Sequence, residues 1–180
     1  MKRKIFLSIN IPPRIQGRLA LKVEKWKNLP VKWVKENNLH ITFFSLGYIE
    51  TDLIPGICEK VLSAASGKEI FDLEFETLDI GPTSENPQYV WLTGKVSEEL
   101  RDLHEEIEKA LGIFSKSRKA FKPHITIGRI RSNKWEELET KPEVHEKFSL
   151  NFSVESVDIM ASDFGEGDSE YALIESCPLK

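Results

Sequence analysis

Two short stretches of the sequence carry the same pair of polar residues, a histidine followed two positions later by a threonine. They are "HITF", which begins at His40, and "HITI", which begins at His124. Successive side chains of a β-strand point to opposite faces, so each histidine shares a face with its threonine, Thr42 or Thr126. Each stretch therefore predicts a strand with one apolar face and one face that carries imidazole beside hydroxyl.

Two such strands that faced each other would suit a displacement at phosphorus. Imidazole has an ordinary pKa near 6.5, so at neutral pH one ring can be neutral while the other is protonated. One ring can accept a proton from the attacking water or hydroxyl, and the other can give a proton to the leaving oxygen, each transfer contributing ~10²–10⁴ in rate. The threonine hydroxyls can donate hydrogen bonds to the non-bridging phosphate oxygens. This chemistry requires no metal ion, because side chains supply the acid, the base and the anion donors.

Alternation and turn signals predict the elements that must position these residues. We expect strands over 4–11, 40–49, 71–80, 88–96, 124–130, 148–160 and 170–176. We expect helices from the Pro12-Pro13 pair to about Lys27, over 51–66 with a threonine or aspartate cap, over 97–112, and near Trp135. The helix over 97–112 has the clearest pattern, since Ser97 can cap it, Gly112 can end it, and its apolar stripe comprises Leu100, Leu103, Ile107 and Leu111.

The repeated motif belongs to a longer internal repeat. "FDLEF" and "YVWL" follow the first motif, while "FSLNF" and "YALI" follow the second at similar offsets. In both copies the long strand shifts its hydrophobic phase midway, which is typical of a bulge or sharp twist. We infer one bilobal domain over 1–180, with approximate lobes 1–87 and 88–180 that could share strands. A pseudo-twofold relation between the lobes would bring the two polar faces together in a cleft.

The composition limits the classes of protein that fit. The chain has 180 residues, 40% hydrophobic and 30% charged, as in a soluble globular protein. No apolar run reaches the ~20 residues that span a membrane, and the N-terminus indicates a first strand and not a signal peptide. We therefore expect a cytoplasmic protein in which Cys58 and Cys177 are free thiols. The formal net charge of −4 argues against an electrostatic grip on long nucleic acid, but it allows binding of one end of a strand.

The two motifs resemble the paired signature of the two-histidine (2H) phosphoesterase superfamily. Within it, nearly the whole chain is similar to the RNA 2′,3′-cyclic phosphodiesterases, historically called 2′-5′ RNA ligases (LigT-like). The segments that carry the resemblance are "RKIFLSINIP", "WVKENNLHITFFSLG", "RKAFKPHITIGRI" and "SDFGEGDSEYALIE". The resemblance implies an α+β fold: two antiparallel sheets related by pseudo-twofold duplication, with helices on the outer faces and a central cleft.

The resemblance also implies an activity and roles for particular residues. It implies hydrolysis of an RNA 2′,3′-cyclic phosphate to a 2′-phosphate, and a reversible 2′-5′ ligation of RNA ends at the same site. By this analogy His124 is the base that activates water, His40 is the acid, and Thr42 and Thr126 hold the phosphate. Arg129 matches the arginine that follows the second motif in this family, as a contact to phosphate or ribose. Since it follows Thr126 by three, a bulge at Gly128 or a reach around the strand end is needed to turn it toward the same face.

The partners and the remaining candidates follow from the same comparison of motifs. The implied substrate is an RNA end, and we expect no nucleotide cofactor, no metal, no membrane, no obligate protein partner, and a monomer. The segment from Lys109 to Trp135, both included, has eight basic residues and no acidic one. Among them, Arg118 and Lys122 could steer phosphate, although a solvated loop explains them equally well.

Several alternatives stay open at this point. The chain could act on a small nucleotide cyclic phosphate, or it could be a non-catalytic module that binds RNA ends. His104 and His145 are expected to be solvated, and Phe43 is expected to lie in the core. Tyr89 and Trp91 share a strand face and are either core residues or a surface on which a terminal base stacks. Trp33 belongs either to the core or to the rim of the cleft.

Overall fold

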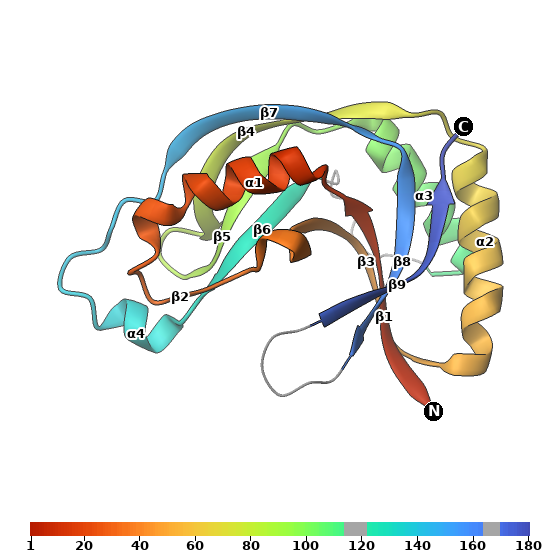
Figure 1. Cartoon of the computed structure of the whole chain (residues 1–180), viewed down its shortest axis with the longest axis horizontal. Coiled ribbons are helices and arrows are strands. Elements are labelled where there is room, and N and C mark those ends of the chain that lie inside the picture. The colour runs from red at the N-terminus through yellow and green to blue at the C-terminus, as the bar shows by residue number, and fades with distance from the viewer. Residues whose placement is uncertain (114–121, 164–169) are drawn as a thin grey trace.

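Two antiparallel sheets form the frame of the protein (Figure 1). The computed structural model describes residues 1–113, 122–163 and 170–180. One sheet, here sheet A, has the strand order β3-β1-β8-β9, and sheet B has the order β2-β6-β5-β4-β7. The strands of sheet A are β1 (Lys2–Asn10), β3 (His40–Glu50), β8 (Ser156–Asp163) and β9 (Glu170–Pro178). Those of sheet B are β2 (Val31–Trp33), β4 (Phe71–Pro82), β5 (Pro87–Gly94), β6 (His124–Ile130) and β7 (Glu146–Val154).

Both sheets take strands from both halves of the chain, and each carries one of the two motifs. His40 begins β3, an edge strand of sheet A, and His124 begins β6 in sheet B. The predicted strand over 148–160 is wrong as a single element, because the chain passes from sheet B to sheet A at Glu155. The phase shift in the earlier strand is a bulge, since the β4 registers with β5 and β7 both slip between Phe75 and Thr77.

The helices lie on the outer faces of the sheets, as predicted. They are α1 (Pro13–Lys22), α2 (Ile54–Ser66), α3 (Glu98–Leu111) and the short α4 (Ser132–Glu136). The first helix ends before Lys27, and a 3₁₀ turn over Glu24–Trp26 follows it. The second helix begins later than predicted, after a 3₁₀ turn over Thr51–Leu53, and its first residues carry no side-chain cap. The sequence did not indicate β2, because three residues are too few to show alternation.

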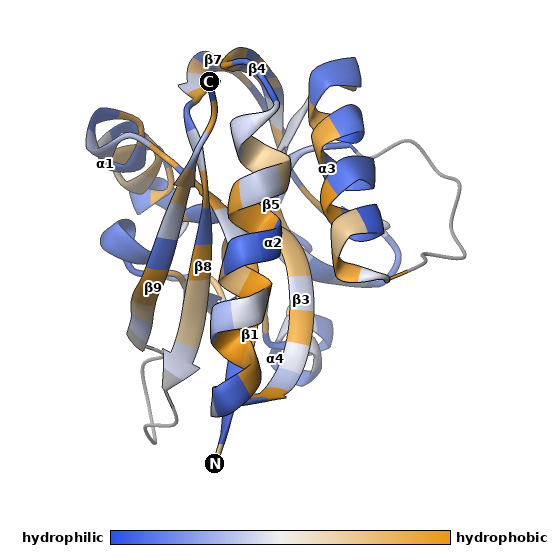
Figure 2. Cartoon of the chain, turned by 90° about the vertical axis from the view of Figure 1, so that its right-hand side faces the viewer, coloured by the Kyte–Doolittle hydropathy of each residue, from blue (hydrophilic) through white to orange (hydrophobic). Residues whose placement is uncertain are grey.

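The helix α3 has the ends and the apolar stripe that its sequence predicts. The Ser97 hydroxyl accepts a hydrogen bond from the Leu100 amide at 3.1 Å, and Gly112 ends the helix in the left-handed conformation with φ of 68°. Leu100, Leu103 and Ile107 are fully buried. Figure 2 shows the apolar side of α3 turned toward the body of the molecule, where it packs beside α2. None of the helices in the described ranges is long and apolar enough to cross a membrane.

The core holds the polar faces of the strands in fixed positions. On β1, the side chains of Ile5, Leu7 and Ile9 are each at most 1% exposed, and they alternate with residues that face the other side of sheet A. Each such side chain stabilises the fold by about 1.5–3 kcal/mol when it leaves water. Because the apolar residues of β3 and β6 join the same core, a shift of register would expose them, and this fixes where the motif residues lie.

Candidate active site

A bulge in β3 decides which residues follow His40 and Thr42 on the polar face of the strand. Thr42 is paired with Ser8, but Leu7 is paired with Phe44, so Phe43 is an extra residue in the ladder. Phe43 is buried, as predicted, at 3% exposure. After the bulge Ser45 is paired with Phe6 and shares the face of Thr42. Simple alternation would have placed Phe44 there, which is why the sequence did not indicate Ser45.

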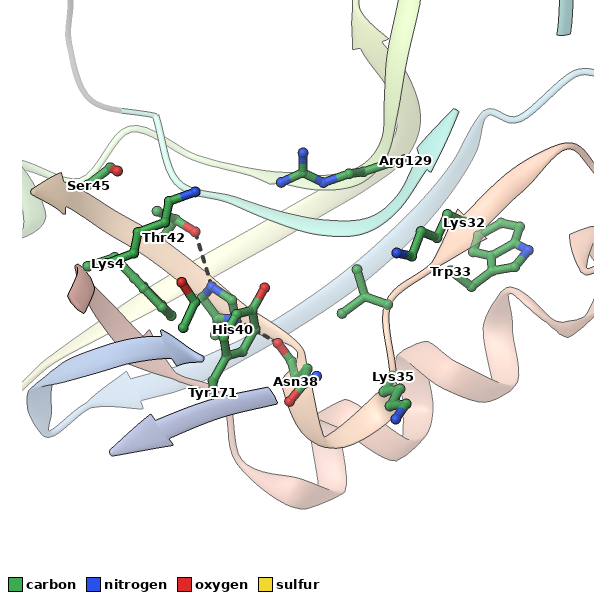
Figure 3. A pocket seen from close by; sticks show the side chains of 13 residues that line it. Lys4, Lys32, Trp33, Lys35, Asn38, His40, Thr42, Ser45, Arg129 and Tyr171 are labelled. Carbon is green, nitrogen blue, oxygen red and sulfur yellow. Dashed lines mark hydrogen bonds between the residues drawn. The ribbon is translucent and has the colours of Figure 1, made fainter. Parts of the chain in front are cut away.

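A pocket of about 430 Å³ lies between the two sheets, on this polar face (Figure 3). Sheet A contributes side chains from β1, β3, β8 and β9, and sheet B contributes side chains from β2 and β6. The pocket is lined by Lys4, Phe6, Lys32, Trp33, Val34, Lys35, Asn38, His40, Thr42, Ser45, Arg129, Ser162 and Tyr171. Four of these are cations and none is a carboxylate, although the whole chain is acidic. The charges of these described lining residues therefore favour an anionic ligand in the pocket.

Hydrogen bonds fix the ring of His40. Its Nδ1 lies 2.6 Å from the carbonyl oxygen of Asn38, and its Nε2 lies 3.1 Å from the hydroxyl of Thr42. A carbonyl only accepts, so Nδ1 carries the proton, and Nε2 is the nitrogen that can gain or lose one. Two aromatic rings, Phe6 at 5.4 Å and Tyr171 edge-on at 5.3 Å, pack against the imidazole. The ring is thus oriented with its reactive nitrogen beside Thr42, as Figure 3 shows.

Burial also changes the acidity of His40. Removal from water disfavours the imidazolium and lowers the pKa of His40 below its ordinary value of 6.5, and the hydrogen bond to the Asn38 carbonyl opposes this in part. His40 in the free protein is therefore more easily deprotonated than a solvated histidine. An anion bound against Nε2 would act in the opposite direction, because it stabilises the charged ring.

A second bulge, in β6, turns Arg129 toward the cleft. Trp91 is paired with Thr126, but Val90 is paired with Gly128, so Ile127 is the extra residue. Arg129 is then paired with Tyr89, which shares a strand face with Trp91, so Arg129 and Thr126 lie on one face. A bulge is present, as the spacing of Arg129 from Thr126 requires, but the extra residue is Ile127 and not the predicted Gly128. Arg129 lines the pocket, and its guanidinium lies 6.0 Å from the Tyr89 ring centre.

His124 and Thr126 lie on the same face of β6 as Arg129, but they are not among the residues that line the pocket. Both are half-buried. Their strand is in contact with β3, which carries His40 and Thr42. The structure thus brings His40, Thr42 and Arg129 together around one pocket and places His124 and Thr126 along the strand that forms its opposite wall.

The other candidates fall into distinct positions. Trp33 lines the pocket, and its Nε1 is buried without a hydrogen-bond partner among the described residues. His104 is not solvated as expected: it stacks on Phe44 at 4.0 Å, because the β3 bulge turns Phe44 toward α3, and burial lowers the pKa of His104. His145 is exposed as expected, and its Nδ1 lies 2.9 Å from a carboxylate oxygen of Asp79.

Arg118 lies outside the described residues. Cys58 and Cys177 are both free thiols. Burial, with further contributions from Cys58 and two carboxylates, raises the pKa of Cys177 to about 11.

The sequence did not indicate the pocket residues Lys4, Lys32 and Ser45. Lys4 could have been found, since it lies two residues before Phe6 on a strand whose intervening residue is apolar. In the ranges that the structure describes, no group of three histidine, cysteine or carboxylate side chains could hold a metal ion.

Comparison with known proteins assigns the chain to a family. The sequence model of the 2′-5′ RNA ligase superfamily matches residues 11–166. A Thermotoga maritima protein named RNA 2′,3′-cyclic phosphodiesterase is 28% identical over 140 residues, 75% of each chain. A Methanocaldococcus jannaschii protein of the same name is 30% identical over 129 residues, 71% of this chain and 72% of that one.

Solved structures share the whole fold. A Thermus thermophilus protein superposes with a TM-score of 0.78 at 21% identity, covering 98% of this chain and 97% of that one. The structure of E. coli LigT complexed with 3′-AMP superposes with a TM-score of 0.73 at 22% identity, covering 99% of both chains. At these identities the likeness establishes the architecture alone, and the sequence match establishes the family. The chain belongs to the 2′-5′ RNA ligase superfamily.

Proposed function

We propose that this protein hydrolyses RNA 2′,3′-cyclic phosphate ends to 2′-phosphates, with its histidines as acid and base. The observation that carries the proposal is the cationic pocket between the sheets, into which His40 presents a nitrogen already paired with a threonine hydroxyl. The name RNA 2′,3′-cyclic phosphodiesterase, which the relatives bear, supports the choice of substrate. The same site would join two ends in a 2′-5′ linkage when a 5′-hydroxyl replaces water as the nucleophile: its oxygen forms the bond to phosphorus, and the bond from phosphorus to O3′ again breaks.

In the proposed reaction His124 takes a proton from water, and the water oxygen forms a bond to phosphorus. The bond from phosphorus to O3′ breaks, and Nε2 of His40 gives its proton to O3′. The products are a 2′-phosphate and a free 3′-hydroxyl. Thr42 and Thr126 donate hydrogen bonds to the non-bridging oxygens, and Arg129 balances their charge.

The direct test is the opening of the ring by the purified protein after chelator treatment. With an oligonucleotide that ends in a 2′,3′-cyclic phosphate, we expect a 2′-phosphate product and undiminished turnover. The product is identified by chromatography against 2′- and 3′-phosphate standards. A 3′-phosphate product, or turnover that stops on chelation and returns with a metal ion, would contradict the mechanism.

The two alternatives predict different results in the same assay. An enzyme for small nucleotides would open a nucleoside 2′,3′-cyclic monophosphate, or ADP-ribose 1″,2″-cyclic phosphate, faster than the oligonucleotide. A non-catalytic module would bind the oligonucleotide and release it unchanged. The imidazoles favour the enzyme, because arginine or lysine would serve simple phosphate binding better than weakly basic histidine.

The lowered pKa of His40 predicts how anion binding depends on pH. As the pH falls from 8 toward the pKa of His40, the ring gains its proton, so sulfate, which stays a dianion throughout, should inhibit at progressively lower concentrations. The measurement is the sulfate inhibition constant at a series of pH values. In His40→Gln, assayed by competition against a bound fluorescent oligonucleotide, the part of the slope due to His40 should disappear. An unchanged slope in that variant would show that His40 does not contact the anion.

A further inference from the structure

The two motif histidines are held in place by different means. Hydrogen bonds to the Asn38 carbonyl and the Thr42 hydroxyl fix the ring of His40. No hydrogen bond joins the His124 ring to any other residue in the described ranges. Its aromatic contact in those ranges is with Trp91 of β5, at 5.1 Å between ring centres and 53° between planes. Among the described residues, the indole of Trp91 is therefore the contact that can orient the His124 ring.

The indole of Trp91 is itself seated against a bare stretch of backbone. A Cβ atom added at Gly81 of β4 would overlap the indole Cζ2 and Cε2 and would lie 2.7 Å from Nε1. On another side the ring of Tyr89 stacks on Trp91, at 5.9 Å and 23°. Gly81, Tyr89 and His124 thus surround the indole, and a side chain at Gly81 would leave it no room in its present position.

We propose that Gly81 and Trp91 are positioning residues for His124. Because Gly81 has no side chain, the indole of Trp91 can pack directly against the backbone of β4, and in this position it contacts and orients the imidazole. The proposal rests on the proposed function only in so far as His124 acts in the reaction. It explains why an aromatic pair sits on a half-exposed strand face next to the site and not in the core. It also explains why residue 81 is a glycine. The φ of Gly81 is not in the left-handed region, so the backbone conformation alone does not require a glycine there.

Gly81→Ala is the first test. The added methyl should displace the indole and with it the His124 ring, so we expect kcat on the cyclic phosphate oligonucleotide to fall by about ten-fold or more, while KM changes by less than about three-fold. The matched control is Gly56→Ala, where a Cβ would meet no atom within 4 Å. Urea unfolding of each variant establishes that the protein is folded under assay conditions. A folded Gly81→Ala protein with wild-type kcat would overturn the proposal.

A double-mutant cycle separates positioning from a general structural effect. Trp91→Leu removes the indole Nε1, Cε2 and Cζ2, which a methyl group added at Gly81 would meet, so we expect it to lower kcat by itself and to make Gly81→Ala nearly neutral in its background. If the two losses in kcat instead multiply, Gly81 acts on activity by another route and the proposal fails.

The orientation of His124 can also be read without activity. The indole shifts the NMR resonances of the His124 ring protons by its ring current, so Gly81→Ala should move them, while those of His104, which stacks on Phe44 of β3 in the other sheet, stay in place. Movement of these resonances would support the positioning contact even if the protein turned out not to open cyclic phosphates. Unmoved resonances would refute the contact whatever the substrate is.

Discussion

Replacing His124 by alanine is expected to lower kcat on an oligonucleotide 2′,3′-cyclic phosphate by about 10²–10⁴. The variant loses the group that accepts the proton of water, while the pocket residues that bind the anion stay in place, so KM should change little. His40→Ala should lose activity by a similar factor, because O3′ then leaves without a proton. The measurement is steady-state kinetics on the purified variants, with binding of the oligonucleotide followed separately by fluorescence anisotropy.

The control for both variants is His145→Ala. That histidine is exposed, pairs with Asp79 and does not line the pocket, so its loss should leave kcat unchanged. His104 is a poorer control, because it stacks on Phe44 and its removal would loosen the contact of α3 with β3. Turnover that survived either His40→Ala or His124→Ala at a wild-type rate would remove that residue from the proposed mechanism.

The sequence predicts the positions of the motif residues because their pattern has one consistent solution. In "HITF" and "HITI" the apolar residues must enter the core, so His40 and Thr42 must share the other face, as must His124 and Thr126. The helix α3 is equally well specified, since its cap, stripe and terminal glycine agree. These features depend on residues that are close in sequence, and local physical chemistry is sufficient to place them.

Features that depend on register between strands are much harder to derive from the sequence. Ser45 and Arg129 face the pocket because one extra residue, Phe43 or Ile127, enters each ladder. The spacing of Arg129 from Thr126 predicts a bulge at Gly128 or a reach around the strand end, and the extra residue is the neighbouring Ile127. Nothing in "FFSLG" indicates the bulge at Phe43. The phase shift within 148–160 predicts a bulge or sharp twist in one strand, whereas the chain crosses from sheet B to sheet A at Glu155. A change of hydrophobic phase looks the same in the sequence in either case.

Gly128, the residue after the bulge, has no side chain to hold β2 and β6 apart. A Cβ at Gly128 would overlap a methyl group of Val31 and lie 3.1 Å from the Trp33 ring. The glycine thus allows β2 to approach β6 closely enough for Lys32 and Trp33 to close the pocket. The position of β2, which the sequence did not indicate, therefore depends on Gly128, the residue that follows the bulge.

Arg129→Ala is expected to lower kcat/KM on the cyclic phosphate oligonucleotide by about 10–100-fold. A hydrogen bond to a charged group contributes about 1.5–3 kcal/mol, and the guanidinium is the cation that β6 supplies to the pocket. Arg129→Lys should recover only part of the loss, because an ammonium group has the charge without the planar pair of donors. The control is Arg131→Ala, which removes an exposed arginine two residues along that does not line the pocket.

Two different roles of Arg129 can be told apart by the sulfate inhibition constant. If the guanidinium contacts the anion, sulfate should inhibit Arg129→Ala less strongly by a factor similar to the loss in kcat/KM. If it serves only to pack on Tyr89, and through Tyr89 on Trp91, kcat should fall while sulfate inhibition stays as in the wild type. Weaker sulfate inhibition of Arg129→Ala would mean that the bulge at Ile127 is needed for anion binding. Without the extra residue, the guanidinium would point to the opposite face of sheet B.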